Sequence, residues 1–252
     1  MYGAIIGDIV GSRFEWMPHK TKEFELFTSD CTPTDDSVLT VAVADAIMSD
    51  NDFESHLRYW GLRYPNAGYG AAFLGWLMND FPAYNSYGNG SAMRVSPIGW
   101  MYESLEETRE MARMSAEVTH NHPEGVKGAE SVASAMWLAR NGHSKTQIKN
   151  YIQREFGYDL DRKVDDIRKT YQFDVTCQGS VPEAIICFLE ATDFEDAIRN
   201  AVSLGGDSDT QAAIAGSIAE AYFGIPEDLI KKCHKYLPHD MLKVINKFYK
   251  EI

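Results

Sequence analysis

Thr34-Asp35-Asp36-Ser37 opens a long apolar segment that runs from Val38 to Met48, and Gly205-Gly206-Asp207-Ser208-Asp209-Thr210 opens a second one, Gln211 to Phe223. Both segments are apolar on nearly every side, which is typical of helices in the middle of a domain. The sequence therefore predicts two central helices, each with aspartates and a threonine at its N-terminal end.

Capping is the simplest interpretation of these residues, because Asp, Ser and Thr accept hydrogen bonds from the free N–H groups of a first helical turn. Capping, however, needs one side chain per helix, and the two stretches together hold four aspartates and the hydroxyls of Thr34, Ser37 and Thr210. If the two stretches meet, carboxylates ~4 Å apart repel one another by about 4 kcal/mol per pair at an effective dielectric constant of about 20. A domain of ordinary stability then needs cations between them.

An all-oxygen set of carboxylates and hydroxyls suits Mg2+, Mn2+ or Ca2+ and does not suit Zn2+. Four carboxylates balance the charge of two divalent cations. We therefore predict a two-metal site where the two helix entrances meet.

The composition indicates a single acidic domain. The chain has 252 residues and no Pro-, Gly- or Ser-rich linker, which predicts one domain over residues 1–252. Its net charge of -13 argues against nucleic acid and anionic membranes as partners, because both bind basic surfaces. Asp8 interrupts the N-terminal apolar run, and no stretch of ~20 apolar residues follows, so we expect neither a signal peptide nor a membrane span. Four cysteines without CxxC spacing are typical of reduced thiols, and we expect a cytoplasmic protein.

Helical periodicity covers most of the remaining chain. Gly3, Gly7 and Gly11 recur every four residues in an apolar N-terminal segment, 3–14, which predicts a buried helix that a neighbouring helix approaches closely. Further helices are predicted over residues 53–64, 71–78, 110–119, 126–140, 145–156, 182–190, 194–202, 227–236 and 239–249. Residues 17–33 read as a loop, and residues 157–180 carry no assignment. With no alternating strands and no internal repeat, we predict an all-α fold, a multi-helix globule.

A glycine-rich passage, Ser86-Tyr87-Gly88-Asn89-Gly90-Ser91-Ala92-Met93-Arg94, precedes apolar residues 95–100. Such passages place free backbone N–H groups beside a phosphate, but Gly and Asn also form ordinary turns, and both interpretations stay open. Tyr69 and Tyr87 lie in glycine-containing loops, where a ring can stack on a flat ligand.

Other candidate motifs give weaker indications of function. His120 and His122 lack a third His or a Cys at zinc spacing, so a polar contact or a helix-capping role is favoured over metal binding. His239-Asp240 is the dipeptide of all-α metal-dependent phosphohydrolases, but it follows Pro238 at a helix start, where Asp is expected, and no upstream His pair accompanies it. Motifs for nucleophilic Ser, for a Walker-type loop and for dinucleotide binding are absent.

Six motifs stand out in chain order. They are Gly7-Asp8-x-Val10-Gly11-Ser12-x-Phe14-Glu15, Thr34-Asp35-Asp36-Ser37, Gly68-Tyr69-Gly70-Ala71, the passage from Ser86 to Arg94, Thr119-His120 and Gly205-Gly206-Asp207-Ser208-Asp209-Thr210. Together they resemble the ADP-ribosylglycohydrolase family, which includes the dinitrogenase reductase-activating glycohydrolases. The resemblance implies an all-α orthogonal bundle, compact, with a central cleft that holds two divalent cations, Mg2+ or Mn2+.

The resemblance also implies roles for individual residues. The implied metal ligands are Thr34, Asp35, Asp36, Asp207, Asp209 and Thr210. The implied substrate-binding residues are Gly70, Ser86, Tyr87, Gly88, Asn89, Gly90, Ser91 and His120. Within that set, the loop from Ser86 to Ser91 would cradle a diphosphate, and Tyr87 would stack on the adenine end. The implied catalytic residues are a movable carboxylate that gates the site, Glu15, and three aspartates, Asp35, Asp36 and Asp209. Which carboxylate acts as the base stays open.

The activity that the resemblance implies is hydrolysis of the glycosidic bond between the distal ribose of ADP-ribose and an acceptor. The partner would be an ADP-ribosylated protein or another ADP-ribosylated acceptor, and ADP-ribose would be the product. Two alternatives are an inactive ADP-ribose-binding protein and an all-α metal-dependent phosphohydrolase that cuts the diphosphate. The loop from Ser86 to Gly90 and the run Gly11-Ser12-x-Phe14-Glu15 resemble the branch of the family that releases O-linked ADP-ribose, from serine or from polymers, more than the arginine branch. The acidic loop 23–30 is the feature that would favour arginine, because carboxylates bind a guanidinium.

Overall fold

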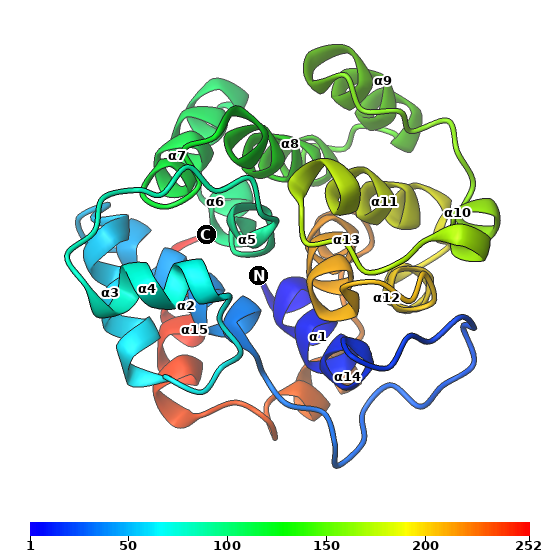
Figure 1. Ribbon diagram of the computed structural model, residues 1–252. Helices are drawn as coiled ribbons and strands as arrows, with labels where there is room; N and C mark the ends of the chain where they lie inside the picture. Colours follow the sequence, from blue (N-terminus) through cyan, green and yellow to red (C-terminus); the bar gives the residue numbers. More distant parts are fainter.

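The computed structural model describes residues 1–252 and contains helices joined by loops, without strands, which confirms the predicted all-α class (Figure 1). Its helices are α1 (Tyr2–Gly11), a 3-10 turn (Ser12–Phe14), α2 (Asp35–Ile47), α3 (Phe53–Arg63), α4 (Ala71–Met78), α5 (Gly90–Met93), α6 (Ser96–Met101), α7 (Leu105–Glu117), α8 (Pro123–Arg140), α9 (Lys145–Phe156), α10 (Val164–Thr170), α11 (Cys177–Glu190), α12 (Phe194–Val202), α13 (Ser208–Phe223), α14 (Glu227–Cys233) and α15 (His239–Glu251). An isolated bridge between Gly88 and Thr176 is the only β-type pairing.

Helices α1 and α13 lie side by side at the centre of the bundle (Figure 1). Glycines make this close approach possible. A Cβ atom added at Gly7 would lie 2.1 Å from the carbonyl oxygen of Ala212, and one added at Gly11 would lie 2.5 Å from the Cα atom of Asp209. The predicted glycine stripe is therefore the contact surface of α1, and it brings the end of α1 against the first turn of α13.

The two central helices that the sequence predicts are buried on all sides. Every residue from Val38 to Ala44 in α2 and every residue from Ser208 to Glu220 in α13 is buried. Helix α2 packs against α1, α3 and α15, whereas α13 also packs against α8, α11 and α12. The N-terminal ends of α2 and α13 are thus both held inside the molecule.

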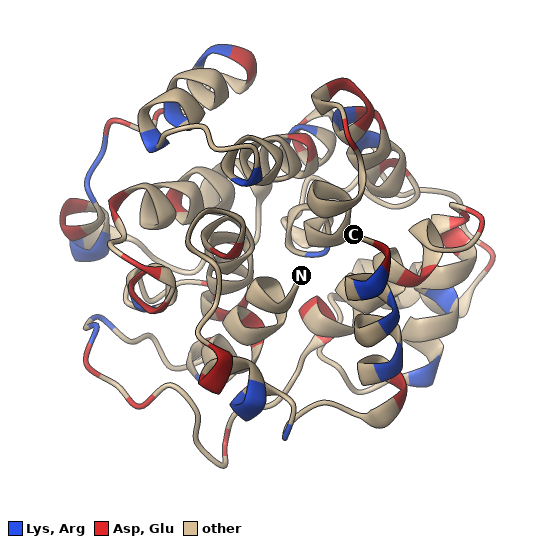
Figure 2. Cartoon of the chain, turned by 180° about the vertical axis from the view of Figure 1, so that it is seen from behind, with Lys and Arg blue, Asp and Glu red and all other residues tan.

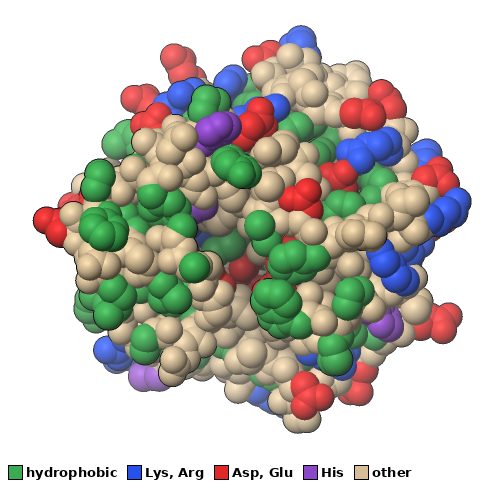
Figure 3. Space-filling view, in the orientation of Figure 1, with side chains coloured by type: hydrophobic (Ala, Val, Ile, Leu, Met, Phe, Trp, Pro, Cys, Tyr) green, Lys and Arg blue, Asp and Glu red, His purple; other side chains and the backbone are tan.

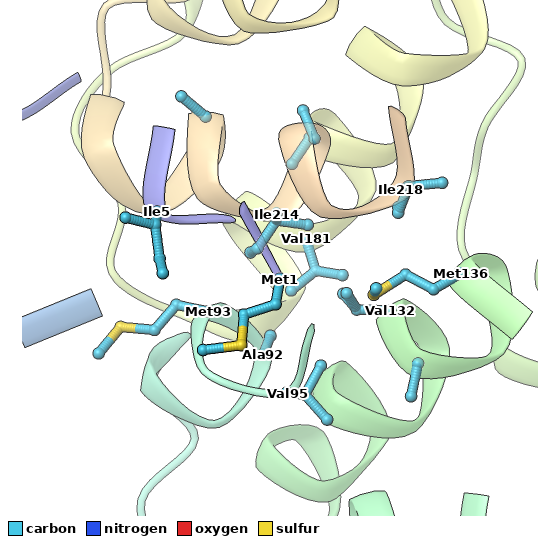
Figure 4. Packing of buried hydrophobic residues seen from close by; sticks show 14 of the residues in the cluster. Met1, Ile5, Ala92, Met93, Val95, Val132, Met136, Val181, Ile214 and Ile218 are labelled. Carbon is cyan, nitrogen blue, oxygen red and sulfur yellow. The ribbon is translucent and has the colours of Figure 1, made fainter. Parts of the chain in front are cut away.

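The hydrophobic core joins α1 and α13 to the helices above them in Figure 1. Figure 4 shows Ile5 and Ile214 in one buried hydrophobic cluster with Val132 and Met136, and each of the four side chains is fully buried. A fully buried aliphatic side chain of this size contributes about 1.5 to 3 kcal/mol to stability. Most Lys and Arg residues lie on the outer helices (Figure 2), whereas four aspartates at the helix entrances, Asp8, Asp36, Asp207 and Asp209, are buried.

Helix α11 begins earlier than the sequence predicts. We expected Pro182 to start this helix, but α11 starts at Cys177 and Pro182 lies inside it. The side chain of Thr176 caps the helix by accepting a hydrogen bond from the N–H of Gly179. Proline lacks the N–H that would bond the carbonyl of Gln178, and Gln178 is exposed, so water can satisfy that carbonyl.

Other boundaries shift where a cap or a turn was overlooked. Helix α7 begins at Leu105 and not at residue 110, because Ser104 accepts a hydrogen bond from the N–H of Glu107. Helix α14 ends at Cys233 and not at residue 236. Residues 157–180, which carried no assignment, contain α10 and a loop, 171–176, that reaches the cavity described below.

Candidate active site and metal centre

The carboxylate of Asp8 fastens α1 to the first turn of α2. It accepts hydrogen bonds from the N–H and the hydroxyl of Thr34, over 2.9 and 2.6 Å, and from the N–H of Ser37 over 3.0 Å. The hydroxyl of Ser37 donates to it as well. Burial raises the pKa of Asp8 to about 6, even though these hydrogen bonds lower it. Asp8 belongs to the first of the six motifs, and its hydrogen bonds make it the centre of the α1–α2 junction.

The entrances of α2 and α13 meet, and their carboxylates form two contiguous groups. Oxygens of Asp8, Asp36 and Asp209 lie within 4.8 Å of one another, and so do oxygens of Glu15, Asp207 and Asp209. Asp209 belongs to both groups. Asp8, Asp36, Asp207 and Asp209 are buried, whereas Glu15 is half-buried at the end of the 3-10 turn.

Burial and mutual repulsion raise the pKa of the carboxyls around this centre. Burial is the largest cause throughout, and the neighbouring carboxylates add to it. The pKa of Asp35 rises to about 8, with Asp8 as its main charged neighbour, and that of Glu15 rises to about 7, with Asp207 as its main charged neighbour. The pKa values of Asp36 and Asp209 rise well above the ordinary range. Without a cation, the group does not hold its full negative charge at neutral pH.

The donor set fits a hard divalent cation. The Oδ2 atom of Asp36 accepts a hydrogen bond from Thr210 Oγ1 over 3.2 Å, but its Oδ1 atom is buried and has no hydrogen-bond partner. A buried carboxylate oxygen without a partner is costly, and a cation would supply one. Asn89 Nδ2 donates to Asp207 Oδ2 over 2.7 Å, which orients that carboxylate from the glycine-rich loop.

Two of the predicted metal ligands, Thr34 and Asp35, do not belong to the two carboxylate groups. The Thr34 hydroxyl donates to Asp8 and accepts a hydrogen bond from the N–H of Asp36 over 3.3 Å, so it caps α2. Asp35 lines the cavity, but it belongs to neither carboxylate group. The capping interpretation and the acidic-cluster interpretation therefore hold for different residues of the same stretch.

A cavity of about 470 Å³ opens above the carboxylates. Figure 3 shows this hollow near the middle of the face, with acidic side chains in its depth and hydrophobic ones around it. Of the residues singled out from the sequence, the cavity is lined by Glu15, Asp35, Asp36, Asp207, Asp209, Thr210, Tyr69, Gly70, Ser86, Gly88, Asn89, Gly90 and His120. Residues from six separate segments thus share one cavity.

The glycine-rich loop uses some of its own N–H groups within the protein. The N–H of Gly88 donates to Ser86 Oγ over 3.1 Å, and the N–H of Asn89 donates to the carbonyl of Val175 over 2.8 Å. Ser91 is fully buried, and its hydroxyl donates to the carbonyl of Gly125 over 2.7 Å, away from the cavity lining. The loop is therefore a rigid wall that the bridge to Thr176 also holds.

Tyr87, which we expected to stack on a ligand, lies outside the cavity lining. Its side chain is 49% exposed and its ring contacts His122 edge-on, with ring centroids 5.3 Å apart. The neighbouring Tyr84 lines the cavity instead and lies beside His120, with centroids 6.0 Å apart.

Several lining residues had no role in the sequence analysis. Trp16 and Phe173 stack on each other with centroids 5.3 Å apart, and Trp16 is 76% exposed. Arg94 is fully buried and also lines the cavity. The position of Trp16 directly after Glu15 and that of Arg94 at the end of the glycine-rich passage are the only local indications. Nothing in the local sequence pattern indicates Phe173.

The helical fold and the acidic cavity define a class of all-α proteins whose ligand site is lined by carboxylates suited to cations. Within that class, the chain belongs to the ADP-ribosylglycohydrolase family, whose family model matches residues 1–252. The family resemblance inferred from the motifs is thereby confirmed.

Relatives with known names agree with this family. ADP-ribosylhydrolase ARH3 of Homo sapiens is 28% identical, over 95% of this chain and 89% of its own length. ADP-ribosylarginine hydrolase Tri1 of Pseudomonas putida is 26% identical, over 92% of this chain and 72% of its own length. The solved structure "ADP-ribosylglycohydrolase-related protein complex" shares the fold with a TM-score of 0.77 and 23% identity, over 99% of this chain and 95% of that one. None of the helices has the length and hydropathy needed to cross a membrane.

Proposed function

We propose that this protein is a hydrolase that releases ADP-ribose from an ADP-ribosylated acceptor by cleaving the glycosidic bond at the distal ribose, with two divalent cations, Mg2+ or Mn2+. The observation that carries the proposal is the convergence of Glu15, Asp36, Asp207 and Asp209 at the bottom of a cavity whose wall is the glycine-rich loop. Family membership and the hydrolases among its relatives support the reaction class.

Asp8 positions the first turn of α2. The oxygens that would hold the cations are those of Asp35, Asp36, Asp207 and Asp209 and the hydroxyl of Thr210, and the Thr34 hydroxyl, which caps α2, would add its remaining lone pair. Two cations bound there would supply positive charge that orients the ribose hydroxyls and polarises the sugar. The all-oxygen donor set favours Mg2+ or Mn2+ over softer metals.

Glu15 is our candidate for the general base. It is half-buried and lines the cavity. Without a cation, burial and the charge of Asp207 raise its pKa to about 7; cations that neutralise Asp207 would lower this pKa, so that Glu15 is ionised at neutral pH and can accept a proton. In the proposed reaction, water attacks the anomeric carbon while ionised Glu15 takes a proton from it. The bond from that carbon to the acceptor breaks, its electron pair goes to the acceptor atom, and the proton that Glu15 took from the water passes to that atom. The surrounding carboxylates stabilise the positive charge that develops on the ribose.

We propose O-linked ADP-ribose as the preferred substrate, on serine or in polymers. An arginine acceptor would need carboxylates beside the leaving group, and the acidic loop 23–30 was the candidate source. No residue of that loop lines the cavity. The lining therefore offers a guanidinium no carboxylates other than Glu15 and the aspartates assigned to cations.

The four cysteines are free and buried, which supports a reducing compartment, and we propose the cytoplasm. An ADP-ribosylated protein or another ADP-ribosylated acceptor is the proposed partner, and the deep acidic cavity in an acidic chain offers no basic surface for nucleic acid.

Product analysis tests the proposal. Serine-linked and arginine-linked ADP-ribosyl peptides would be incubated with the protein and Mg2+ or Mn2+, and the products separated by liquid chromatography and mass spectrometry. We expect intact ADP-ribose, released faster from serine. AMP with ribose phosphate would identify a phosphohydrolase, and binding of ADP-ribose without any product would identify a binding protein. Faster release from arginine would overturn the linkage preference only.

A further inference from the structure

We propose that Arg94, acting through the hydroxyl of Thr119, holds the neutral ring of His120 in the tautomer that carries its proton on Nε2. This N–H then faces the cavity as a fixed hydrogen-bond donor for an oxygen of the ligand. Arg94 and Thr119 are positioning residues in this arrangement, because neither needs to touch the ligand. The identity of that oxygen as one of ADP-ribose rests on the proposed function.

Arg94 determines which atoms donate and which accept in this chain of hydrogen bonds. The Arg94 side chain is 0% exposed, and neither of its hydrogen-bond acceptors is a carboxylate. Its Nη2 atom donates to the carbonyl of Ser115 and to Thr119 Oγ1, both over 2.9 Å. A guanidinium has only donors, and with a pKa lowered by burial to about 10 it is still charged at neutral pH. Thr119 Oγ1 is therefore the acceptor in its bond with Arg94.

The Thr119 hydroxyl then has one hydrogen left to donate. Thr119 is fully buried, and the only other polar atom in contact with its hydroxyl is His120 Nδ1, 2.7 Å away. If Nδ1 carried the proton, it would donate to Thr119 and leave the hydroxyl hydrogen buried without an acceptor, which is costly. Nδ1 therefore accepts the bond from Thr119, and a neutral ring carries its proton on Nε2.

His120 is held neutral and faces open space on its Nε2 side. Burial, followed by the charge of Arg94, lowers its pKa well below the ordinary value. A Cβ atom added at Gly90 would lie 3.0 Å from Nε2, and one added at Gly88 would lie 3.5 Å from it. His120 and both glycines line the cavity, and Nε2 has no hydrogen-bond partner in the protein. The missing Cβ atoms of the loop thus leave room for a ligand atom beside this donor.

A fixed donor has a clear use in this cavity. The carboxylates at the bottom of the cavity, when ionised, accept hydrogen bonds and donate none. The N–H groups of Gly88 and Asn89 are already bonded within the protein. A diphosphate or a ribose presents oxygens that need donors, and a histidine in the other tautomer would present a lone pair to them. The Arg94–Thr119 pair selects the tautomer that attracts such oxygens.

Nuclear magnetic resonance of the ring nitrogens tests the tautomer without any ligand. The protein has seven histidines, so 15N-histidine labelling with His120→Gln as the assignment control isolates the signals of His120. We expect a protonated Nε2 and an unprotonated, hydrogen-bonded Nδ1 across neutral pH. Protonated Nδ1 with unprotonated Nε2 in the wild-type protein would overturn the proposal. This readout does not depend on the protein's activity.

Matched variants of Thr119 test the coupling. Thr119→Ser keeps the hydroxyl, whereas Thr119→Val has nearly the same shape without it. With Mg2+ present, we expect ADP-ribose to bind Thr119→Val about tenfold more weakly, as for the loss of one well-placed hydrogen bond, and Thr119→Ser to stay within about twofold of wild type. We also expect the Nδ1 resonance to lose its hydrogen-bonded position in Thr119→Val only. Equal affinities and equal Nδ1 resonances for the two variants would overturn the role of Thr119.

Arg94→Met tests the first link, with circular dichroism to show whether the variant folds. If it folds, we expect an altered Nδ1 resonance and weaker ADP-ribose binding, and unchanged values for both would overturn the role of Arg94. If it does not fold, the wild-type tautomer and the Thr119 pair still decide the proposal. If wild type binds no ADP-ribose, the proposed function fails, while the ring-nitrogen spectrum still decides the tautomer.

Discussion

Thr210 Oγ1 donates a hydrogen bond to Asp36 Oδ2 over 3.2 Å, although the two residues are 174 positions apart in the chain. The bond joins the first turn of α13 to the first turn of α2. The other oxygen of Asp36 is buried without a partner. Carboxylate oxygens of Asp8, Asp36 and Asp209, one from each, lie within 4.8 Å of one another. The folded chain thus assembles a carboxylate cluster that a bound cation would complete.

Replacing a cluster carboxylate by an amide tests the cation assignment. We expect Asp36→Asn and Asp209→Asn to lower turnover more than about a hundredfold, because even residues that only orient a metal ligand change affinity or activity by about 10- to 100-fold. The fold should persist, since a buried charge is removed. ADP-ribose release measures the turnover, and titration with Mg2+ by calorimetry measures the binding of the cation. Asp166→Asn is a matched control, because the Asp166 side chain is 71% exposed and pairs only with Lys169. Full activity of Asp209→Asn in the presence of EDTA would contradict the assignment.

The glycine stripe of α1 provides a second test. A methyl group at Gly11 would lie 2.5 Å from the Cα atom of Asp209, so we expect Gly11→Ala to lower the free energy of unfolding by about 1 to 3 kcal/mol. It should also reduce turnover, because the displaced backbone carries Asp209. Gly75→Ala in α4 has open space around the new methyl group and should instead stabilise by about 0.5 to 1 kcal/mol. Urea unfolding of the two variants gives the comparison, and equal effects would show that the stripe is not a close contact.

The raised carboxyl pKa values predict how the metal-free protein responds to pH. In the folded state the pKa values rise from 3.8 to about 6 at Asp8, from 4.5 to about 7 at Glu15 and from 3.8 to about 8 at Asp35. Because each folded-state pKa lies above the unfolded value, the folded state binds more protons, and stability falls as pH rises from about 4 through about 8. We expect the Tm without cations to fall over this range.

Added Mg2+ should raise the Tm more at the upper end of that range than at the lower end, because protons compete with the cation for the carboxylates. Thermal unfolding of the wild type and of Asp35→Asn measures this, and the variant should show a flatter dependence on pH. A Tm increase on adding Mg2+ that does not change with pH would contradict the proposed competition.

Substitution of Tyr87 tests whether its ring stacks on the ligand. In the structure this ring is 49% exposed and lies outside the cavity lining. Stacking of an aromatic ring on a base contributes roughly 1 to 3 kcal/mol, so Tyr87→Ala should weaken ADP-ribose binding by about ten- to a hundredfold. Tyr59→Ala, an exposed tyrosine on α3 away from the cavity, serves as the control. An unchanged dissociation constant in calorimetry would remove Tyr87 from the site.

Substitution of Glu15 distinguishes a role in the chemical step from a role in binding ADP-ribose. If it acts as the base or gates the cavity, Glu15→Ala and Glu15→Gln should lower kcat far more than they weaken ADP-ribose binding. The wild-type rate should also rise with pH as Glu15 ionises, with a midpoint below the metal-free pKa of about 7 because bound cations favour the carboxylate, and Glu15→Gln should lose that dependence. Rate profiles against pH, measured with saturating cation, check this. A variant with the wild-type pH profile would assign the base to another carboxylate.

Some features of this protein followed from the sequence alone. The all-α class, the two helices buried on every side and the glycine stripe of α1 were all predictable, because helical periodicity and the small size of glycine act between residues a few positions apart. The resemblance to the family rested on the order of short motifs, which is also local information. The same local rules misplaced the start of α11, because the cap at Thr176 was not distinguished from other polar residues.

The tertiary structure alone decided how these motifs combine. Asp8 became the centre of the α1–α2 junction, and Arg94 and Phe173 became cavity walls, although neither periodicity nor spacing distinguished them. Conversely, Tyr87 lies outside the lining although its glycine-rich loop forms one wall. The physical reason is that a side chain's direction in a loop, and the distance between helix ends far apart in the chain, depend on how all the intervening helices pack. A local sequence pattern contains no information about that packing.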